Sequence, residues 1–112
     1  MIARLMGLAT VSPREVLRGL EDGSTVVLDV NTPASWPYGR VPGARRLDHA
    51  AFEPADLPGD REAALVFYCS NPLCGKAPNA AKRARAMGRT NVRVMSAGIS
   101  GWISAGLPVE SD

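Results

Sequence analysis

The sequence predicts an α/β fold with an open, mostly parallel central sheet flanked by helices on both faces. Short β-branched or apolar runs alternate with segments of helical periodicity, which is typical of parallel strands joined by helical crossovers. Residues 63–68 form an unbroken apolar run, as expected of a central strand buried on both faces. The length of 112 residues, with 46% hydrophobic and 21% charged side chains, suits one small domain. We therefore expect a single domain over residues 1–112.

The first half of the chain begins with a helix start signal. Ser12 is a candidate N-cap, Pro13 suits the first helical position, and Glu15 completes a capping box. Residues 25–30 are rich in β-branched side chains and predict a buried strand. Residues 31–43 contain three prolines and two glycines, so we expect a loop without regular structure.

The middle of the chain carries weaker signals, followed by a clear helix. Residues 44–47 predict a brief strand, and residues 50–57 predict at most a short helix. After the apolar strand, Pro78 or Asn79 can open a helix with alanines at helical spacing, which Gly88 closes. A third strand over residues 92–95 and a short helix over residues 98–105 complete the alternation.

Cys69 is the strongest candidate for a chemical role. It directly follows the apolar strand and precedes a loop that leads into a helix. In an open parallel sheet, ligands bind at the carboxyl ends of the strands. Backbone N–H groups of such a loop and the positive end of the helix dipole favour a thiolate at this position. The alternative, a small apolar cysteine that only fills space, remains open.

Charge and cysteine content limit the other function classes. Residues 76–93 hold six Lys or Arg side chains and no acid, so we expect a positive side that either attracts anions or is a solvated helix face. The absence of interleaved aromatics and of any nucleic-acid-binding signature argues against nucleic acid. No apolar run is long enough to cross a membrane, and two cysteines make no disulfide framework, so we expect a cytoplasmic protein.

Three stretches together resemble the rhodanese-like family of sulfurtransferase domains. They are residues 29–30 with 39–44, residues 68–69 with 80–81, and residues 98–102 with 105–108. The departures are Asn31 at the usual Arg position, Arg40 at the usual His position, and Cys74 where a loop Arg is often found. The loop after Cys69 is about two residues longer than the family's common loop. It indicates a subgroup with a Cys-x-x-x-x-Cys active-site loop.

The resemblance implies a fold and a reaction. Cys69 would attack the outer sulfur of a small anionic donor such as thiosulfate and become a persulfide, and a thiol, a cyanide-like nucleophile or a protein acceptor would then remove the sulfur. The loop that would bind the substrate comprises Ser70, Asn71, Pro72, Leu73, Cys74, Gly75 and Lys76. Asp29 and Arg40 would support the site. We expect no cofactor, and no metal site, because the two cysteines and the lone His49 lack the spacing of metal ligands.

Three further alternatives remain. Cys74 is either a second thiol that resolves an oxidised or persulfidated Cys69 or a small loop residue. A loop that admits a tetrahedral oxyanion would make the protein a cysteine-dependent phosphatase or an arsenate reductase-like enzyme, although residues 70–78 contain no Arg to bind one. A nonenzymatic rhodanese-like module for binding or redox sensing is the third alternative.

Overall fold

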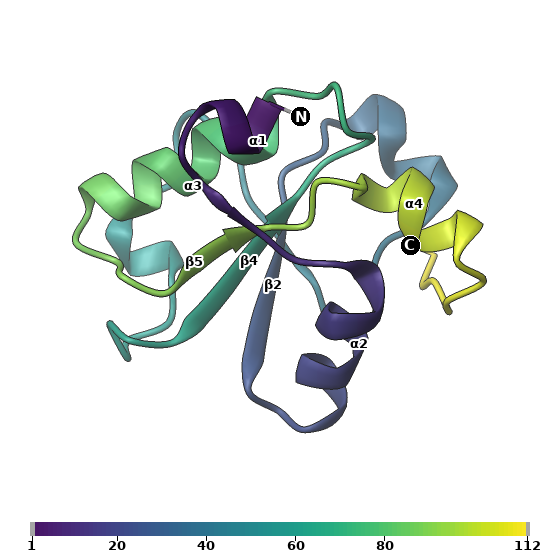
Figure 1. The fold of residues 1–112 in the computed structure, drawn as a ribbon, viewed down its shortest axis with the longest axis horizontal. Coiled ribbons are helices and arrows are strands. Elements are labelled where there is room, and N and C mark those ends of the chain that lie inside the picture. The colour runs from purple at the N-terminus through teal and green to yellow at the C-terminus, as the bar shows by residue number, and fades with distance from the viewer. Residues whose placement is uncertain (1, 112) are drawn as a thin grey trace.

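The computed structural model describes residues 2–111 of the chain, and the side chains of all of these except residues 2 and 5. Helices and strands alternate along it, as expected (Figure 1). In chain order they are α1 (Ile2–Leu5), β1 (Ala9–Thr10), α2 (Pro13–Glu21), β2 (Thr25–Asp29), the 3-10 helix η1 (Pro33–Tyr38), β3 (Arg45–Arg46), the 3-10 helix η2 (Pro54–Asp56), β4 (Ala64–Tyr68), α3 (Lys76–Ala86), β5 (Val92–Val94) and α4 (Gly98–Ser104).

The five strands form one open sheet in the order β1-β5-β4-β2-β3, and every neighbouring pair is parallel. The predicted fold class is therefore confirmed. β2 and β4 lie side by side at the centre and pair along their whole length, from Thr25 opposite Ala64 to Asp29 opposite Tyr68. Both strands thus end at the same edge of the sheet, so the chain segments that follow Asp29 and Tyr68 lie close together.

Helices cover both faces of the sheet. Helices α1 and α3 lie on one face, where Ala3 and the buried alanines of α3 join the core, and α2 and α4 lie on the other (Figure 1). The side chains of β4 alternate between these two layers: Leu65 and Phe67 belong to the first core, and Val66 and Tyr68 to the second. This two-sided burial explains why the strand is apolar at every position.

Three local features differ from the sequence-based expectation. The helix predicted to open at Pro78 or Asn79 begins at Lys76. A proline fits in the first turn of a helix, because an N–H group at that position would have no hydrogen-bond partner within the helix. The expected loop over residues 31–43 contains the 3-10 helix η1, in which Pro33 supplies the φ angle that its first position needs. The short elements α1 and β1 were not expected, since two to four residues carry no periodicity.

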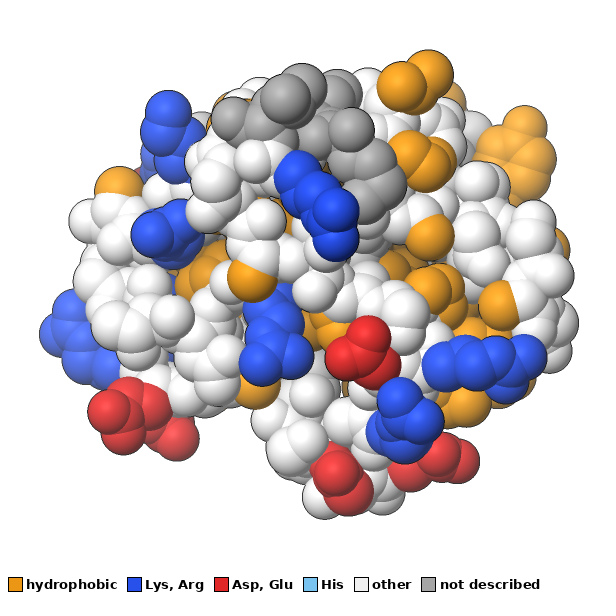
Figure 2. All heavy atoms as spheres, viewed as in Figure 1, with side chains coloured by type: hydrophobic (Ala, Val, Ile, Leu, Met, Phe, Trp, Pro, Cys, Tyr) orange, Lys and Arg blue, Asp and Glu red, His pale blue; other side chains and the backbone are white. Residues whose placement is uncertain are grey.

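Some side chains of the basic segment, residues 76–93, form hydrogen bonds within the fold. Arg83 Nε donates to the carbonyl oxygen of Phe52 at 2.9 Å, and Arg89, 8% exposed, donates to the carbonyl of Asp60 at 2.9 Å. Lys82 and Arg85 are exposed on α3, and Figure 2 shows Lys and Arg side chains toward the α3 side of the molecule. Within residues 2–111, no helix is long and apolar enough to cross a membrane.

Candidate active site

Cys69 lies at the sheet edge where it was expected, directly after β4. Its side chain is 3% exposed and packs at the end of the core beneath α3. The Sγ–H group donates to the carbonyl oxygen of Cys74 at 3.6 Å, and the sulfur receives backbone N–H groups of Ala77 and Ser70. The thiol therefore contacts both the loop and the first turn of α3, with polar partners on the loop side and apolar neighbours on the other.

Cys74 is half-buried and shares this environment. Its sulfur receives the backbone N–H groups of Lys76 and Ser70, and the Cys69 thiol is close enough to shift its pKa. The Lys76 ammonium lies 3.9 Å from the Cys74 sulfur. Both cysteines are free thiols. The loop thus holds two thiols near each other, with one cation beside Cys74.

Their surroundings separate the acidities of the two thiols. Burial raises the pKa of the Cys69 thiol to about 12, and the hydrogen bond and negative charge of Cys74 act in the same direction. Burial also opposes ionisation of Cys74, but the hydrogen bond from Cys69, the amides of Lys76 and Ser70, and the Lys76 charge outweigh it and lower its pKa. The expectation that the loop favours a Cys69 thiolate is therefore wrong for this conformation. The surroundings thus raise the pKa of Cys69 and lower that of Cys74.

Alkylation should reveal this order. With iodoacetamide in limiting amount, we expect Cys74 to react first, because the thiolate is the reactive form of cysteine. In the Cys74→Ser variant, removal of the neighbouring charge should lower the pKa of Cys69 from about 12, so that its alkylation begins at lower pH than in the parent protein. Peptide mapping across a pH series measures both effects. Preferential labelling of Cys69 in the parent protein would contradict the assigned order.

The outer part of the loop is held mainly by its own turn. The Asn71 side chain accepts the Leu73 amide at 2.9 Å, and the Asn71 carbonyl accepts the Cys74 amide at 3.1 Å. Pro72 is exposed and Leu73 is 82% exposed, so the tip contributes little burial. Movement of this tip would therefore cost few packing contacts.

The inner part of the loop is fastened to the start of α4. The amides of Ile99 and Ser100 donate to the carbonyl oxygens of Cys69 and Ser70 at 2.9 and 3.0 Å. Gly98 permits this approach: its φ is +67°, and a Cβ built there would lie 2.5 Å from the Ser70 carbonyl carbon. Sequence reasoning placed Gly98 at a helix start but missed its role as a close-packing position beneath the loop.

Replacing this glycine tests the anchoring of the loop. Gly98→Ala should lower the free energy of unfolding by more than about 2 kcal/mol, since it combines backbone strain with a steric clash against the backbone after Cys69. Gly106→Ala is the matched control, because Gly106 has a φ of +75° but no atom within 4 Å of its ideal Cβ. We expect about 1–2 kcal/mol for the control, from backbone strain alone. Urea denaturation of both variants makes the comparison, and equal losses would contradict the close-packing role.

Asp29 supports the same edge from the neighbouring strand. It is 1% exposed, and its carboxylate accepts the Asn31 amide at 2.9 Å and the Tyr68 hydroxyl at 3.0 Å. Arg46 Nε lies 3.7 Å from the same carboxylate. Burial and the nearby Asp29 charge raise the pKa of Tyr68, so the hydroxyl remains a donor. Asp29 thereby fixes the segment after β2 rather than touching Cys69.

A second link joins that segment to the cysteine loop. The Ser70 hydroxyl donates to the Asn31 side-chain oxygen at 2.9 Å and lies 3.3 Å from the hydroxyl of Ser35. Asn31 stands where the rhodanese-like family usually has Arg, but that resemblance gave no reason for an amide side chain. The hydrogen bond that the Asn31 side-chain oxygen accepts from the Ser70 hydroxyl explains the amide.

Arg40 pairs with a carboxylate of the C-terminal segment. Its Nε lies 3.9 Å from the Glu110 carboxylate, and its backbone pairs with that of Glu110. Among the described residues, no hydrogen bond or ion pair joins the Arg40 side chain to the cysteine loop. The structure thus places Arg40 with the C-terminal segment, where a carboxylate balances its charge. Within the same residues, no group of three or more His, Cys, Asp or Glu side chains is arranged to hold a metal ion.

The space around the thiols is small, and a larger cleft lies beside it. The cavity that Cys69 and Cys74 line has a volume of about 10 Å³, close to the smallest space that holds one water molecule (roughly 10–15 Å³). The neighbouring cleft of about 470 Å³ is lined by Ser35, Tyr38, Ser70, Asn71, Ile99, Ser100, Ile103 and Ser104. It reaches the loop from the side of η1 and α4, and its walls carry hydroxyl groups.

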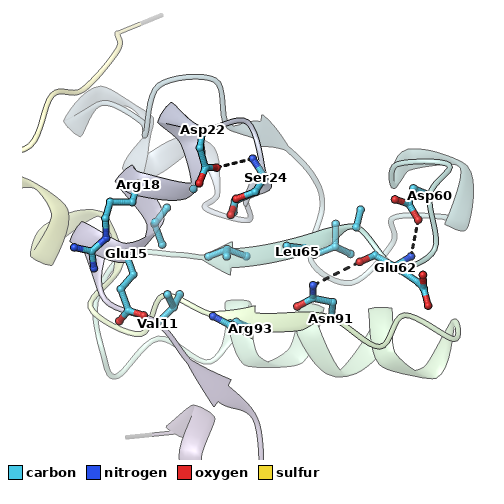
Figure 3. Close-up of a pocket in the computed structure, with 16 residues that line it drawn as sticks. Val11, Glu15, Arg18, Asp22, Ser24, Asp60, Glu62, Leu65, Asn91 and Arg93 are labelled. Carbon is cyan, nitrogen blue, oxygen red and sulfur yellow. Dashed lines mark hydrogen bonds between the residues drawn. The ribbon is translucent and has the colours of Figure 1, made fainter.

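A larger cavity lies away from the thiols. Its volume is about 680 Å³, and it lies at the amino ends of the central strands, beneath α2 (Figure 3). Side chains of both charges, including Glu15, Arg18 and Arg93, line it, and neither cysteine does. This cavity is therefore separate from the cysteine loop.

Comparison with known proteins gives one family and several relatives. The model of the family described as rhodanese-like domain matches residues 12–105. The HTH-type transcriptional regulator Rv0324 of Mycobacterium tuberculosis is 36% identical to this chain over 102 residues, which cover 89% of this chain and 44% of the regulator. The chain thus spans less than half the length of that curated relative.

Two solved structures of similar size share the fold. The human single-domain sulfurtransferase TSTD1 is 25% identical, with a TM-score of 0.71, covering 85% of this chain and 95% of its own. A Rhodopseudomonas palustris protein described as a possible tyrosine phosphatase is also 25% identical, with a TM-score of 0.75, covering 93% of this chain and 86% of its own. Both sulfur-transfer and phosphatase descriptions therefore occur among structures similar to this chain.

Proposed function

Because this chain belongs to the rhodanese-like domain family, we propose that it is a sulfurtransferase that carries sulfane sulfur as a persulfide on Cys69. The observation that carries the proposal is the position of the Cys69 sulfur at the carboxyl end of β4, against the amides of Ser70 and Ala77. These amides hydrogen-bond an anionic sulfur without any metal. The similarity to a human sulfurtransferase supports the same reaction.

The first step forms the persulfide. The Cys69 sulfur attacks the outer sulfur of a thiosulfate-like donor, a new sulfur–sulfur bond forms, and the electron pair of the old bond leaves with sulfite. The Cys69 proton leaves with the sulfite, so this step needs no second thiol. The terminal sulfur of the product carries the negative charge, and the loop amides stabilise it.

The donor reaches Cys69 when the loop tip moves outward. The resting cavity of about 10 Å³ is too small for a tetrahedral sulfur oxyanion. The exposed Pro72 and Leu73 can shift without loss of core packing, and the adjoining hydroxyl-lined cleft then gives access. Lys76 supplies positive charge at this entrance. Arg40 pairs with Glu110 and is a weaker candidate for donor attraction.

The remaining roles follow from the reaction. The donor is a small anion, and the acceptor is a thiol, a cyanide-like nucleophile or a protein nucleophile. We propose that residues 1–112 act as one rhodanese-like domain with no cofactor, in a reducing compartment such as the cytoplasm, where the two thiols stay free.

Sulfite release tests the proposal. Reduced protein mixed with excess thiosulfate under argon should release one equivalent of sulfite per chain, whatever happens afterwards to the bound sulfur. Continued turnover is measured as the sum of thiocyanate and sulfide formed when cyanide and a dithiol reductant are also present. The absence of a sulfite burst with thiosulfate and with other sulfane donors would contradict the assignment.

A phosphatase is the second candidate, favoured by the similar Rhodopseudomonas palustris structure. The cysteine loop offers amides and Lys76, but residues 70–78 contain no Arg to bind a phosphoryl group with two hydrogen bonds. We therefore expect hydrolysis of a phosphotyrosine analogue to be weak beside sulfur transfer. Efficient Cys69-dependent hydrolysis, without sulfite release from any donor, would reverse this ranking. An arsenate reductase-like reaction is disfavoured for the same reason, because the loop has no Arg to bind the oxyanion.

A regulatory module is the third candidate, since the curated relative is a transcriptional regulator. In that case the two thiols would sense sulfur or oxidants rather than turn over a substrate. A single sulfite burst without sustained turnover, even with acceptor and reductant present, would favour this reading.

A further inference from the structure

We propose that Cys74 resolves the Cys69 persulfide within the loop and releases the transferred sulfur as hydrosulfide, leaving a Cys69–Cys74 disulfide. This inference rests on the proposed function, since it concerns the fate of the sulfur after it reaches Cys69. It assigns the product and a class of reductant to the site, and it separates the roles of the two thiols.

The first support is the closeness of the two cysteines. The Cys69 thiol lies 3.6 Å from the Cys74 carbonyl oxygen, and each thiol shifts the pKa of the other. Four residues lie between the two cysteines in sequence, and the Asn71 turn folds this segment so that Cys74 returns to the end of β4. A second sulfur nucleophile is therefore already beside Cys69 before any acceptor arrives.

The second support is the confined space. Cys69 is 3% exposed, and the cavity beside it has a volume of about 10 Å³. Once the loop has closed over a persulfide, an external acceptor can reach the sulfur only if the loop opens again. Cys74 is part of the loop and needs only to move toward Cys69. An intramolecular attack by a positioned thiol avoids the entropic cost of bringing in a second molecule.

The third support is the charge beside Cys74. The Lys76 ammonium lies 3.9 Å from its sulfur, and the Lys76 and Ser70 amides point to the same atom. A cation and amide donors stabilise the thiolate, which is the form that attacks a sulfur–sulfur bond. Among the described residues, Cys69 and Cys74 are the free thiols, so no other cysteine of this chain competes.

The step balances in atoms and charge. The Cys74 sulfur attacks Cys69 Sγ, the Cys69–Cys74 bond forms, and the bond between Cys69 Sγ and the terminal sulfur breaks. The electron pair leaves with the terminal sulfur, which takes the Cys74 proton and departs as hydrosulfide. A dithiol reductant then reduces the loop disulfide and is itself oxidised to a disulfide.

Intact mass spectrometry tests this step, with thiosulfate as the only donor, under argon and without added reductant. The parent protein should lose two hydrogen atoms and release one equivalent of sulfide, measured with monobromobimane, together with one equivalent of sulfite. Cys74→Ser should gain one sulfur atom, release sulfite and release no sulfide. Cys74→Ala serves as a second variant, and parent protein without thiosulfate controls for air oxidation.

The outcomes separate this inference from the proposed function. A parent protein that keeps the added sulfur and releases no sulfide would overturn the resolving role while leaving the persulfide chemistry in place. A mass loss of two hydrogens that also occurs without thiosulfate would likewise overturn it. If neither the parent protein nor either variant releases sulfite, the proposed function itself fails, and the inference fails with it.

Discussion

Cys69→Ser should abolish sulfite release from thiosulfate and lower turnover by roughly a thousandfold or more. A serine hydroxyl at this buried position does not ionise near neutral pH, and oxygen does not carry sulfane sulfur as a persulfide does. The substitution changes one atom in a site that is 3% exposed, so we expect the fold to persist. Sulfite assays on the parent and variant proteins, with circular dichroism of both, measure the effect.

Cys74→Ser is the matched control for that experiment. It makes the same chemical change five residues away in the same loop, and Cys69 keeps the amides of Ser70 and Ala77. We expect the control to release its first equivalent of sulfite. Full activity of Cys69→Ser would disprove the nucleophile assignment, and equal loss in both variants would indicate that both thiols are obligatory for persulfide formation.

Asp29→Asn should destabilise the protein by about 3–5 kcal/mol, the cost of removing one partner from a buried charge pair. The carboxylate now accepts from the Tyr68 hydroxyl and faces Arg46. An asparagine has an NH₂ group in place of one of the two carboxylate oxygens and carries no charge, so the core would lose one hydrogen-bond acceptor and the charge that faces Arg46. Urea denaturation monitored by tryptophan fluorescence measures the loss.

Tyr68→Phe is the control for this network. It removes the hydroxyl that donates to Asp29 and accepts from the Val41 amide, but leaves the Asp29–Arg46 pair in place. We expect a smaller loss of about 1–3 kcal/mol, as for other buried hydrogen bonds. A stability of Asp29→Asn equal to that of the parent protein would show that the buried carboxylate is not a structural anchor.

The sequence predicted the parts of the fold that depend on local pattern. The capping box of Ser12 and Glu15 starts α2, because both reciprocal hydrogen bonds are encoded within four residues. The apolar run before Cys69 became the central strand β4, since burial on both faces leaves no polar position. The position of Cys69 at the sheet edge followed from these elements.

Other features depend on residues far apart in the chain, so no local pattern encodes them. The partner of Arg40 is Glu110, seventy positions away. The raised pKa of Cys69 results from burial beneath α3 and contact with Cys74, whereas the sequence showed only a strand end before a helix. The close packing of Gly98 beneath the loop could not be predicted, because it depends on how closely α4 approaches Ser70.

The central claim is that Cys69 accepts the sulfur, and the masses of the two single-thiol variants test it most directly. After anaerobic incubation with thiosulfate, the account predicts that Cys74→Ser gains the mass of one sulfur atom, which cyanide removes, while Cys69→Ser keeps its mass. The contradicting result is a sulfur gained by Cys69→Ser, which would place the acceptor at Cys74, or no gain in Cys74→Ser.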